Sequence, residues 1–128
     1  FDSRSEAFRR HGIEVGVLTA VVGQGAFALE PVFYWPAPRT DYYRRLFDAT
    51  TLAGFRDFPP NPEGEAVVME VRRRLLELFL QRGASHLQVG KTYRYREGVG
   101  PAAFALVQAL KTAVDPRGLM NPGALGLS

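Results

Sequence analysis

The stretch IEVGVLTAVVGQGAFALEPVFYW, residues 13–35, decides the fold. It holds two runs rich in β-branched and aromatic residues, 13–22 and 26–35, on either side of Gly23-Gln24-Gly25. Two such runs joined by a short glycine-rich segment predict a β-hairpin. Pro31 cannot donate a ladder hydrogen bond, so it marks an edge or a bulge in the second run. An antiparallel pair of strands is therefore expected early in the chain.

Short helices are expected on both sides of this hairpin. Ser3 begins a capping-box spacing that predicts a helix over residues 3–11. After the hairpin, Thr40 is a suitable cap for a short helix that runs to about Phe47. The prolines of residues 56–65 then predict a loop.

The strongest helix signal covers residues 63–82. Apolar residues recur there every three or four positions, as expected for one buried helix face. They are Val67, Val68, Val71, Leu75, Leu78 and Phe79. The arginines at 72–74 fall mostly off this face, which favours a solvated surface over an anion or membrane-surface site.

The segment SHLQVGKTYRY, residues 85–95, alternates in the manner of a strand. A regular strand would place Leu87, Val89, Lys91, Tyr93 and Tyr95 on one face, and His86, Gln88, Thr92 and Arg94 on the other. The segment is therefore expected to add a strand to the sheet.

A last helix is expected from Pro101, a favoured first helical residue, to about Ala113. Its inward-facing residues would be Phe104, Val107 and Leu110. Hairpin strands mixed with helices indicate the α+β class, with an antiparallel sheet covered by helices on one face.

Composition excludes several classes of function. The 128 residues contain no cysteine, which rules out disulfides, thiolate chemistry and Cys-based zinc sites. A net charge of +3 is too small to indicate nucleic-acid binding. No apolar run has the length of a membrane span, and no signal peptide opens the sequence. His11 and His86 are not at ligand spacing, so no protein metal site is expected.

The end of the chain, VDPRGLMNPGALG (114–126), favours neither a helix nor a strand. Asp115-Pro116 and Asn121-Pro122 should each start a turn, because proline fixes φ and pushes the residue before it out of the helical region. Gly118 and Gly123 allow a positive φ within these turns. An ordinary C-terminal tail needs no such turns, so this one is expected to lie against something.

The longer segment ALKTAVDPRGLMNPGALG, residues 109–126, resembles the C-terminal signature of FAD-linked oxidases of the vanillyl-alcohol oxidase type. This broad group contains D-lactate dehydrogenases and glycolate oxidase subunits. The residues that carry the resemblance are Leu110, Lys111, Asp115, Pro116, Gly118, Asn121, Pro122 and Gly123. The stretches HLQVGKTYRY and LEPVFYW also resemble strands of that family.

The resemblance implies an architecture. Residues 1–114 would form a ferredoxin-like cap domain on the substrate side of a flavin, and residues 115–128 a tail that returns to the FAD domain. FAD would be the cofactor, with Asn121, Pro122 and Gly123 near it. Because Gly23-Gln24-Gly25 lacks a third glycine and joins two strands, it cannot hold a dinucleotide pyrophosphate.

The FAD-binding domain is therefore expected upstream of residue 1, and residues 1–128 alone should neither bind FAD nor turn over substrate. Phe1 in place of an initiating methionine indicates a processed chain, an excised domain or a fragment. The tail would pack on the FAD domain of the same polypeptide, and a homo-oligomer stays open. The expected location is cytoplasmic, with peripheral membrane association as an alternative.

The implied reaction is hydride transfer from a small hydroxylated substrate to FAD, with a 2-hydroxy acid as the first choice. The lactate and glycolate branch typically carries a His-x-Gly-Asp-Gly-Asn-x-His stretch. The nearest segment here, VVGQGAFA (21–28), keeps the glycines but has no His, Asp or Asn. Metal-assisted oxidation is therefore not expected.

The candidate catalytic residues are His86, Tyr93 and Arg94, and the candidate substrate-binding residues are Lys91, Tyr95 and Tyr34. A tyrosine hydroxyl beside a cation can bind a carboxylate and polarise the hydroxyl being oxidised. The alternative is that the tyrosines pack under helices, that Lys91 extends into solvent and that His86 is an ordinary half-buried histidine. Tyr34 and Trp35 also fit a role as core or interface aromatics.

Two other functions stay open at this point. An aryl-alcohol oxidase or dehydrogenase would use Tyr93 and Arg94, which match the Tyr-Arg pair of that branch, to hold a phenolate. A non-catalytic α+β module would instead bind a partner through its sheet and never meet flavin. A flavin spectrum of the full coding product separates these classes.

Overall fold

The computed structural model describes residues 4–86, 88 and 90–127. It divides into two compact units, Phe1–Arg72 and Arg73–Ser128. The boundary falls within the long helix α4 (Pro62–Gln81), so this one helix supplies residues to both units.

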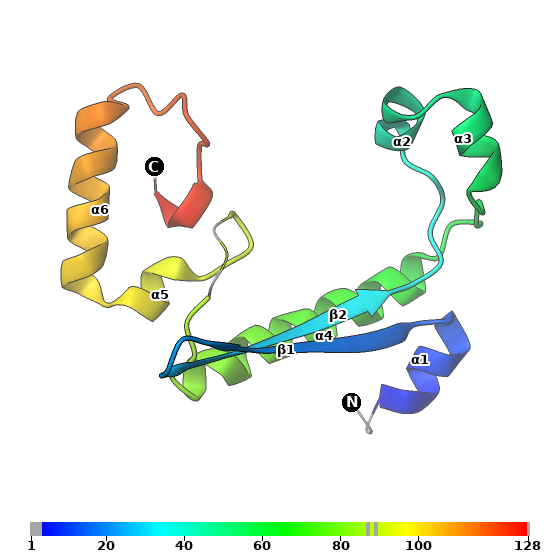
Figure 1. Cartoon of the computed structure of the whole chain (residues 1–128), viewed down its shortest axis with the longest axis horizontal. Coiled ribbons are helices and arrows are strands. Elements are labelled where there is room, and N and C mark those ends of the chain that lie inside the picture. Colours follow the sequence, from blue (N-terminus) through cyan, green and yellow to red (C-terminus); the bar gives the residue numbers. More distant parts are fainter. Residues whose placement is uncertain (1–3, 87, 89, 128) are drawn as a thin grey trace. The chain divides into compact units, whose positions relative to one another are not determined.

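The first unit contains the predicted hairpin. Strand β1 (Glu14–Val22) pairs antiparallel with β2 (Ala26–Tyr34), and the register runs from Glu14 opposite Tyr34 to Val22 opposite Ala26 (Figure 1). Gly23 in the connecting turn has a φ of 61°, which a residue with a Cβ adopts only at a cost. Pro31 lies within β2 and is tolerated because both strands of a two-stranded sheet are edges.

Helix α1 (Ser5–His11) precedes the hairpin and ends at Gly12. Gly12 is left-handed and the Ile13 N–H donates to the Phe8 carbonyl at 2.8 Å, an arrangement that closes a helix end. The described part of α1 has no side-chain cap at its N-terminus, and the predicted cap Ser3 lies outside the described residues.

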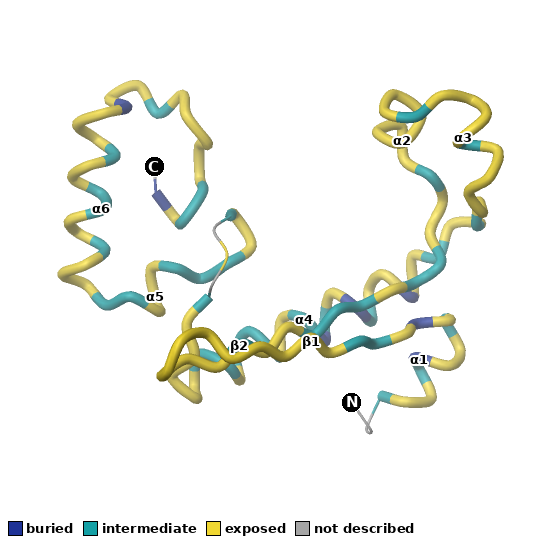
Figure 2. The backbone as a smooth tube through the Cα atoms, in the orientation of Figure 1, coloured by how far each residue is buried: buried dark blue, intermediate teal, exposed yellow. Residues whose placement is uncertain are grey.

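The core of the first unit gathers around α1 and α4. Its buried apolar residues are Phe8, Ile13, Val68 and Val71, and Val68 is completely buried (Figure 2). The Phe8 ring meets the Phe33 ring of β2 edge to face, with 6.4 Å between centroids. The Arg4 guanidinium also contacts the Glu70 carboxylate at 2.9 Å, so α1 is tied to both α4 and the hairpin.

Helix α4 follows its prediction closely. Asn61 caps it, because the Asn61 side-chain oxygen accepts from the Gly64 N–H at 3.1 Å. The predicted buried face is confirmed at Val67, Val68, Val71, Leu75 and Phe79, which are buried or half-buried. Leu78 is 43% exposed, so its predicted inward position is wrong.

Between hairpin and α4 lie two short helices, α2 (Asp41–Leu46) and α3 (Ala49–Gly54). The first was expected. Helix α3 was not expected, although Asp48 is a residue type that favours the start of a helix. The Asp48 carboxylate caps α3, since it accepts hydrogen bonds from the N–H and the hydroxyl of Thr51, both at 2.9 Å. Packed rings of Tyr43, Phe47 and Phe55 join the two helices.

The second unit continues from α4 through a segment that contradicts one prediction. Residues 85, 86, 88 and 90–94 form bends and irregular backbone, and Tyr95 begins helix α5 (Tyr95–Val99). Leu87 and Val89 of the predicted strand lie outside the described residues. The alternating pattern is wrong as a strand prediction here, because no neighbouring strand in the described part of this unit supplies ladder hydrogen bonds.

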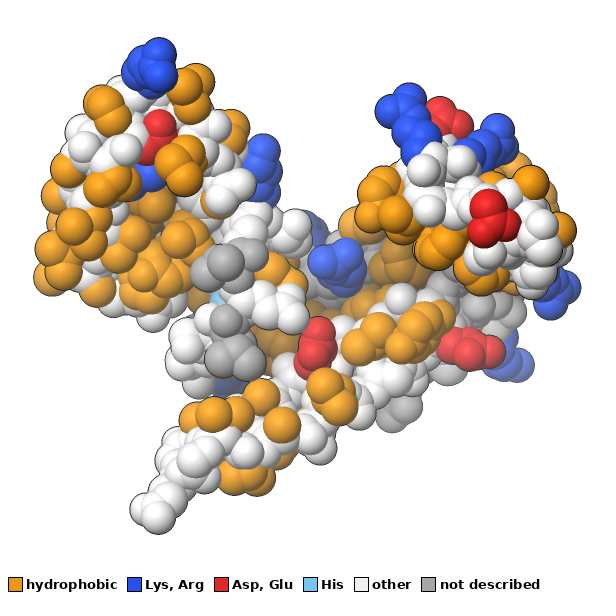
Figure 3. All heavy atoms as spheres, turned by 45° about the horizontal axis from the view of Figure 1, so that its top comes forward, with side chains coloured by type: hydrophobic (Ala, Val, Ile, Leu, Met, Phe, Trp, Pro, Cys, Tyr) orange, Lys and Arg blue, Asp and Glu red, His pale blue; other side chains and the backbone are white. Residues whose placement is uncertain are grey.

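Helix α6 (Pro101–Val114) completes the helices of this unit and matches its predicted bounds within one residue. Phe104 and Val107 are half-buried as expected, but Leu110 is 56% exposed. Figure 3 shows hydrophobic side chains at the surface of this unit. Leu106, Leu110 and Val114 of α6 are exposed. The α+β class with an antiparallel sheet is confirmed for the molecule.

Candidate functional site

The C-terminal tail forms the two turns that its sequence predicts. The Gly118 N–H donates to the Asp115 carbonyl at 3.0 Å, and the Ala124 N–H donates to the Asn121 carbonyl at 3.0 Å. Gly118 and Gly123 have φ values of 62° and 78°, as the turns require. A short 3-10 helix, η2 (Ala124–Gly126), follows the second turn.

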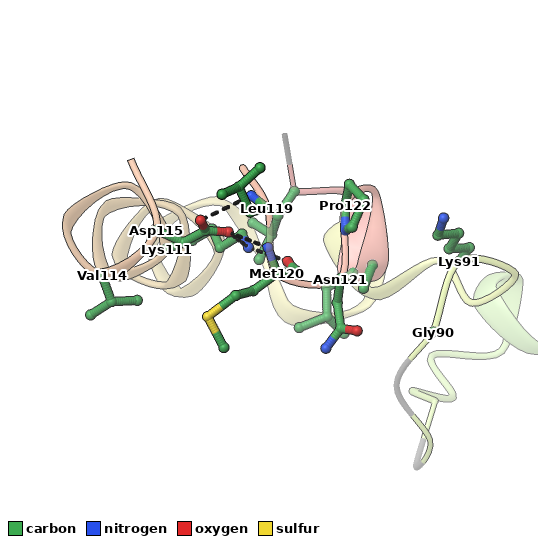
Figure 4. A pocket seen from close by; sticks show the side chains of 12 residues that line it. Gly90, Lys91, Lys111, Val114, Asp115, Leu119, Met120, Asn121 and Pro122 are labelled. Atoms are coloured by element: carbon green, nitrogen blue, oxygen red, sulfur yellow. Dashed lines mark hydrogen bonds and ion pairs between the residues drawn. The ribbon is translucent and has the colours of Figure 1, made fainter. Parts of the chain in front are cut away.

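Two side chains at the end of α6 hold the first part of this tail. The Asp115 carboxylate accepts hydrogen bonds from the N–H groups of Leu119 and Met120, both at 2.9 Å. The Lys111 ammonium donates to the Asp115 carboxylate and to the Met120 carbonyl (Figure 4). We call this arrangement of Lys111, Asp115 and the Leu119 and Met120 peptide groups the tail clasp.

The tail clasp is shielded from solvent. The side chain of Lys111 is 14% exposed and that of Asp115 is 6% exposed. The hydrogen bond from Lys111 lowers the pKa of Asp115 to about 2, with help from the N–H groups of Met120 and Leu119. Asp115 is therefore ionised at neutral pH, and the clasp stays closed there.

The tail clasp borders an open hollow of about 830 Å³ within the second unit. Its lining is mainly apolar and comes from the tail, the end of α6 and the bend before α5. Three of the lining residues are candidate site residues from the sequence: Lys91, Asn121 and Pro122. Figure 4 labels them together with the residues of the clasp. The tail and the bend are joined directly, because the Leu125 N–H donates to the Gly90 carbonyl at 3.3 Å.

Lys91 and the Asn-Pro-Gly turn are neighbours in this hollow. A Cβ placed on Gly123 would lie 3.9 Å from the Lys91 Cε. Lys91 is exposed, and none of the residues that the structure describes forms an ion pair with it. The hollow thus combines a free cation, the Asn121 amide and an apolar wall.

Two of the predicted residues, His86 and Tyr93, lie together in the bend. The Tyr93 hydroxyl donates to the Gln88 side-chain oxygen at 2.5 Å, and the His86 ring lies 5.1 Å from the Tyr93 ring. His86, Tyr93 and Arg94 are half-buried. Gly90 connects this group to the hollow, since a Cβ on Gly90 would lie 3.5 Å from the Tyr93 ring.

The strand faces expected for this segment are not formed. Arg94 lies just before α5 and Tyr95 is its first residue, so Lys91, Tyr93 and Tyr95 do not share the face of a strand. Tyr34 ends β2 in the first unit, where it is 59% exposed. The structure therefore brings Lys91 to Asn121, Pro122 and Gly123, and His86 to Tyr93, and leaves Tyr34 in the other unit.

Sequence reasoning missed the role of Lys111 and Asp115. Both residues belong to the motif that carries the family resemblance, and their spacing of four on a helix is itself a signal for an ion pair. In the part of the chain that the structure describes, no three His, Asp or Glu side chains gather as a metal site. No described helix has both the length and the apolar composition to cross a membrane.

Comparisons with known proteins find a family similarity for part of the second unit. Residues 88–125 match the model of a family described as "FAD linked oxidases, C-terminal domain". These residues include the tail clasp, the Asn-Pro-Gly turn and the lining of the hollow except Leu127. Residues 88–125 are thus similar to the C-terminal region of FAD-linked oxidases, in agreement with the resemblance of the tail motif.

One curated relative is similar to part of this chain. A segment of 41 residues is 46% identical to a protein of Danio rerio named "Probable D-lactate dehydrogenase, mitochondrial". The segment is 32% of this chain and 8% of that protein, so the match spans a small part of the relative's length. No solved structure matches the chain.

Proposed function

We propose that this chain is the C-terminal substrate-side portion of an FAD-dependent oxidoreductase that oxidises a 2-hydroxy acid. One observation carries the proposal: Lys91, expected to bind substrate, and Asn121 and Pro122, expected to lie near flavin, line the same hollow. They come from two segments some thirty residues apart in sequence. The family match and the likeness to a protein named as a probable D-lactate dehydrogenase support the same assignment.

The chemistry of the hollow suits the ring end of FAD. Leu119 and Met120 are 64% and 65% exposed, and a flat aromatic ring would cover apolar side chains of this kind. The Asn121 amide offers a donor and an acceptor to the polar edge of such a ring. Among the described residues nothing resembles a glycine-rich pyrophosphate loop, so we place the rest of the cofactor on a separate FAD domain of the parent polypeptide.

Lys91 would bind the carboxylate of the substrate. An ammonium without an ion-pair partner among the described residues gains a charge-assisted hydrogen bond when a carboxylate enters the hollow. FAD supplies the hydride acceptor for the hydrogen on the hydroxyl-bearing carbon. The hydroxyl loses its proton, and we assign His86 as its acceptor and Tyr93 and Arg94 as the groups that polarise and orient that hydroxyl.

The remaining predicted residues have supporting roles in this proposal. Tyr95, at the start of α5, is assigned to the substrate side next to Arg94. Tyr34 belongs to the first unit and would reach substrate only when the parent protein is assembled. Pro122 and Gly123 shape the turn that presents the Asn121 amide.

The test begins with the full coding product around this sequence. The product should show the visible spectrum of bound flavin, and a panel of D-2-hydroxy acids should bleach it under anaerobic conditions. Bleaching by phenolic alcohols alone would overturn the 2-hydroxy acid assignment in favour of an aryl alcohol held by Tyr93 and Arg94. A folded product without flavin would overturn the enzyme assignment and leave a non-catalytic binding module.

Lys91 gives a sharper test of the substrate class. Lys91→Met removes the cation and should raise KM for the acid about 100-fold, while Lys91→Arg should keep most of the affinity. Arg117→Met is a matched control, since Arg117 is an exposed tail cation with no described partner. An unchanged KM in Lys91→Met would contradict the role of Lys91.

A further inference from the structure

The tail clasp holds both polar groups of one residue. The Met120 N–H donates to Asp115 at 2.9 Å, and the Met120 carbonyl accepts from the Lys111 ammonium. Both side chains come from the last turn of α6 and the residue that ends it. The backbone of Met120 is therefore anchored to the helix at its donor and at its acceptor.

This anchoring fixes the start of the next residue. The Met120 carbonyl and the Asn121 nitrogen belong to one planar peptide group, so holding the carbonyl sets the plane from which Asn121 begins. Asn121 then adopts a φ of 46°, a value that residues other than glycine seldom take. On its other side, the Asn121 carbonyl accepts from the Ala124 N–H at 3.0 Å.

Asn121 is thus held from both directions, and its side chain points away from the clasp (Figure 4). A helix could end at Asp115 with far fewer bonds. The clasp uses three donors on one buried carboxylate and shares one ammonium between two acceptors. Such a network restricts geometry more than a simple C-cap requires.

We propose, on the basis of the function proposed above, that Lys111 and Asp115 are positioning residues that present the Asn121 amide to the flavin ring. They act through the Met120 peptide and not by contact with the reacting atoms. Because a small displacement of a contact near the reacting centre lowers the rate strongly, loss of the clasp should reduce kcat. KM for the acid should stay unchanged, since Lys91 is untouched.

The experiment compares four variants in the full coding product. Lys111→Met and Asp115→Asn open the clasp, Lys111→Arg keeps a cation that can bond both acceptors, and Arg117→Met removes a tail cation outside the clasp. Hydrogen exchange at Leu119 and Met120, measured by mass spectrometry without substrate, reports the clasp directly. It should rise about tenfold in the two opening variants and remain unchanged in Arg117→Met.

The second readout is the bound flavin. Lys111→Met and Asp115→Asn should keep their flavin content, but their flavin absorption bands should shift and their kcat should fall about 100-fold. Lys111→Arg should keep absorption bands and a kcat close to those of the unaltered product. Unchanged exchange would overturn the clasp as the holder of the tail. Faster exchange with unchanged flavin bands and kcat would overturn its positioning role. Absence of flavin from the unaltered product would instead overturn the proposed function, which keeps the two failures distinct.

Discussion

Asn121 is the residue on which the proposed cofactor contact depends. Because Asn121 has a φ of 46°, substitutions can separate the contribution of its backbone conformation from that of its side-chain amide. Glycine accepts a positive φ without strain and removes the amide, whereas alanine removes the amide and adds strain. The pair Asn121→Gly and Asn121→Ala therefore distinguishes the turn from the chemistry.

We predict that Asn121→Gly leaves the melting temperature of the full product unchanged but lowers kcat about 100-fold, because a hydrogen-bonding group at the ring is lost. Asn121→Ala should lose activity to the same degree and about 1 kcal/mol of stability in addition. Kinetics and thermal melts of both variants check this. Full activity in Asn121→Gly would reduce Asn121 to a turn residue.

The lowered pKa of Asp115 predicts how the stability of the clasp depends on pH. Its pKa is lowered to about 2 from an ordinary value of 3.8, because Lys111 and two N–H groups bind the ionised form. A lowered pKa in the folded state means that the clasp contributes its full stabilisation above pH 3.8 and loses it as the pH falls through about 2.

The amide signals of Leu119 and Met120 should follow this titration in NMR spectra of the chain. Their chemical shifts should stay constant from neutral pH to about 4 and change with a midpoint near 2. In Asp115→Asn the transition should disappear. A midpoint at the ordinary value of an aspartate would show that the clasp is open in solution.

At the scale of elements, the hairpin depends on its turn. Gly23 has a φ of 61°, while Gly25 has no left-handed φ, and a Cβ at either position meets open space. Gly23→Ala should therefore destabilise the first unit by about 1 kcal/mol through backbone strain. Gly25→Ala should be neutral or slightly stabilising, because it restricts the unfolded chain.

Urea unfolding followed by tryptophan fluorescence measures this difference. The chain has one tryptophan, Trp35, and it lies in the first unit just after β2. Equal effects of the two substitutions on the free energy of unfolding would mean that Gly23 does not have a positive φ in solution.

The long helix α4 has its own prediction. Val68 is completely buried, and its neighbour Met69 is 44% exposed. Val68→Ala deletes two buried methyl groups and leaves a cavity, so it should cost about 2 kcal/mol. Met69→Ala should change the free energy of unfolding by less than about 0.5 kcal/mol. The same fluorescence measurement applies, and similar values for both would contradict the described face of α4.

At the scale of the whole molecule, we propose that the rest of the cofactor site lies outside these 128 residues. The hollow offers a ring-sized apolar wall and a few polar groups, all of them in the second unit. We predict that the chain expressed by itself leaves the visible spectrum of added FAD unchanged, and that the full coding product copurifies with flavin. Tight FAD binding by the chain alone would contradict the assignment of the cofactor to a separate domain.

Local signals in the sequence were sufficient for much of this molecule. The hairpin, most of the buried face of α4, the start of α6 and the two tail turns all follow from patterns within a few residues along the chain. The family resemblance was likewise readable from the tail motif and is confirmed over residues 88–125. Short-range preferences of proline, glycine and asparagine explain these successes.

Only the tertiary structure decided which residues meet. Residues 85–95 alternate like a strand, but alternation does not supply the partner strand whose hydrogen bonds a strand requires. The approach of Lys91 to Gly123 also joins segments separated along the chain. The sequence by itself determined the hairpin, the two longer helices, the tail turns and the family resemblance of the tail, because these arise from local conformational preference and a contiguous motif. The hollow arises from packing between the tail and the bend before α5, which no local pattern specifies.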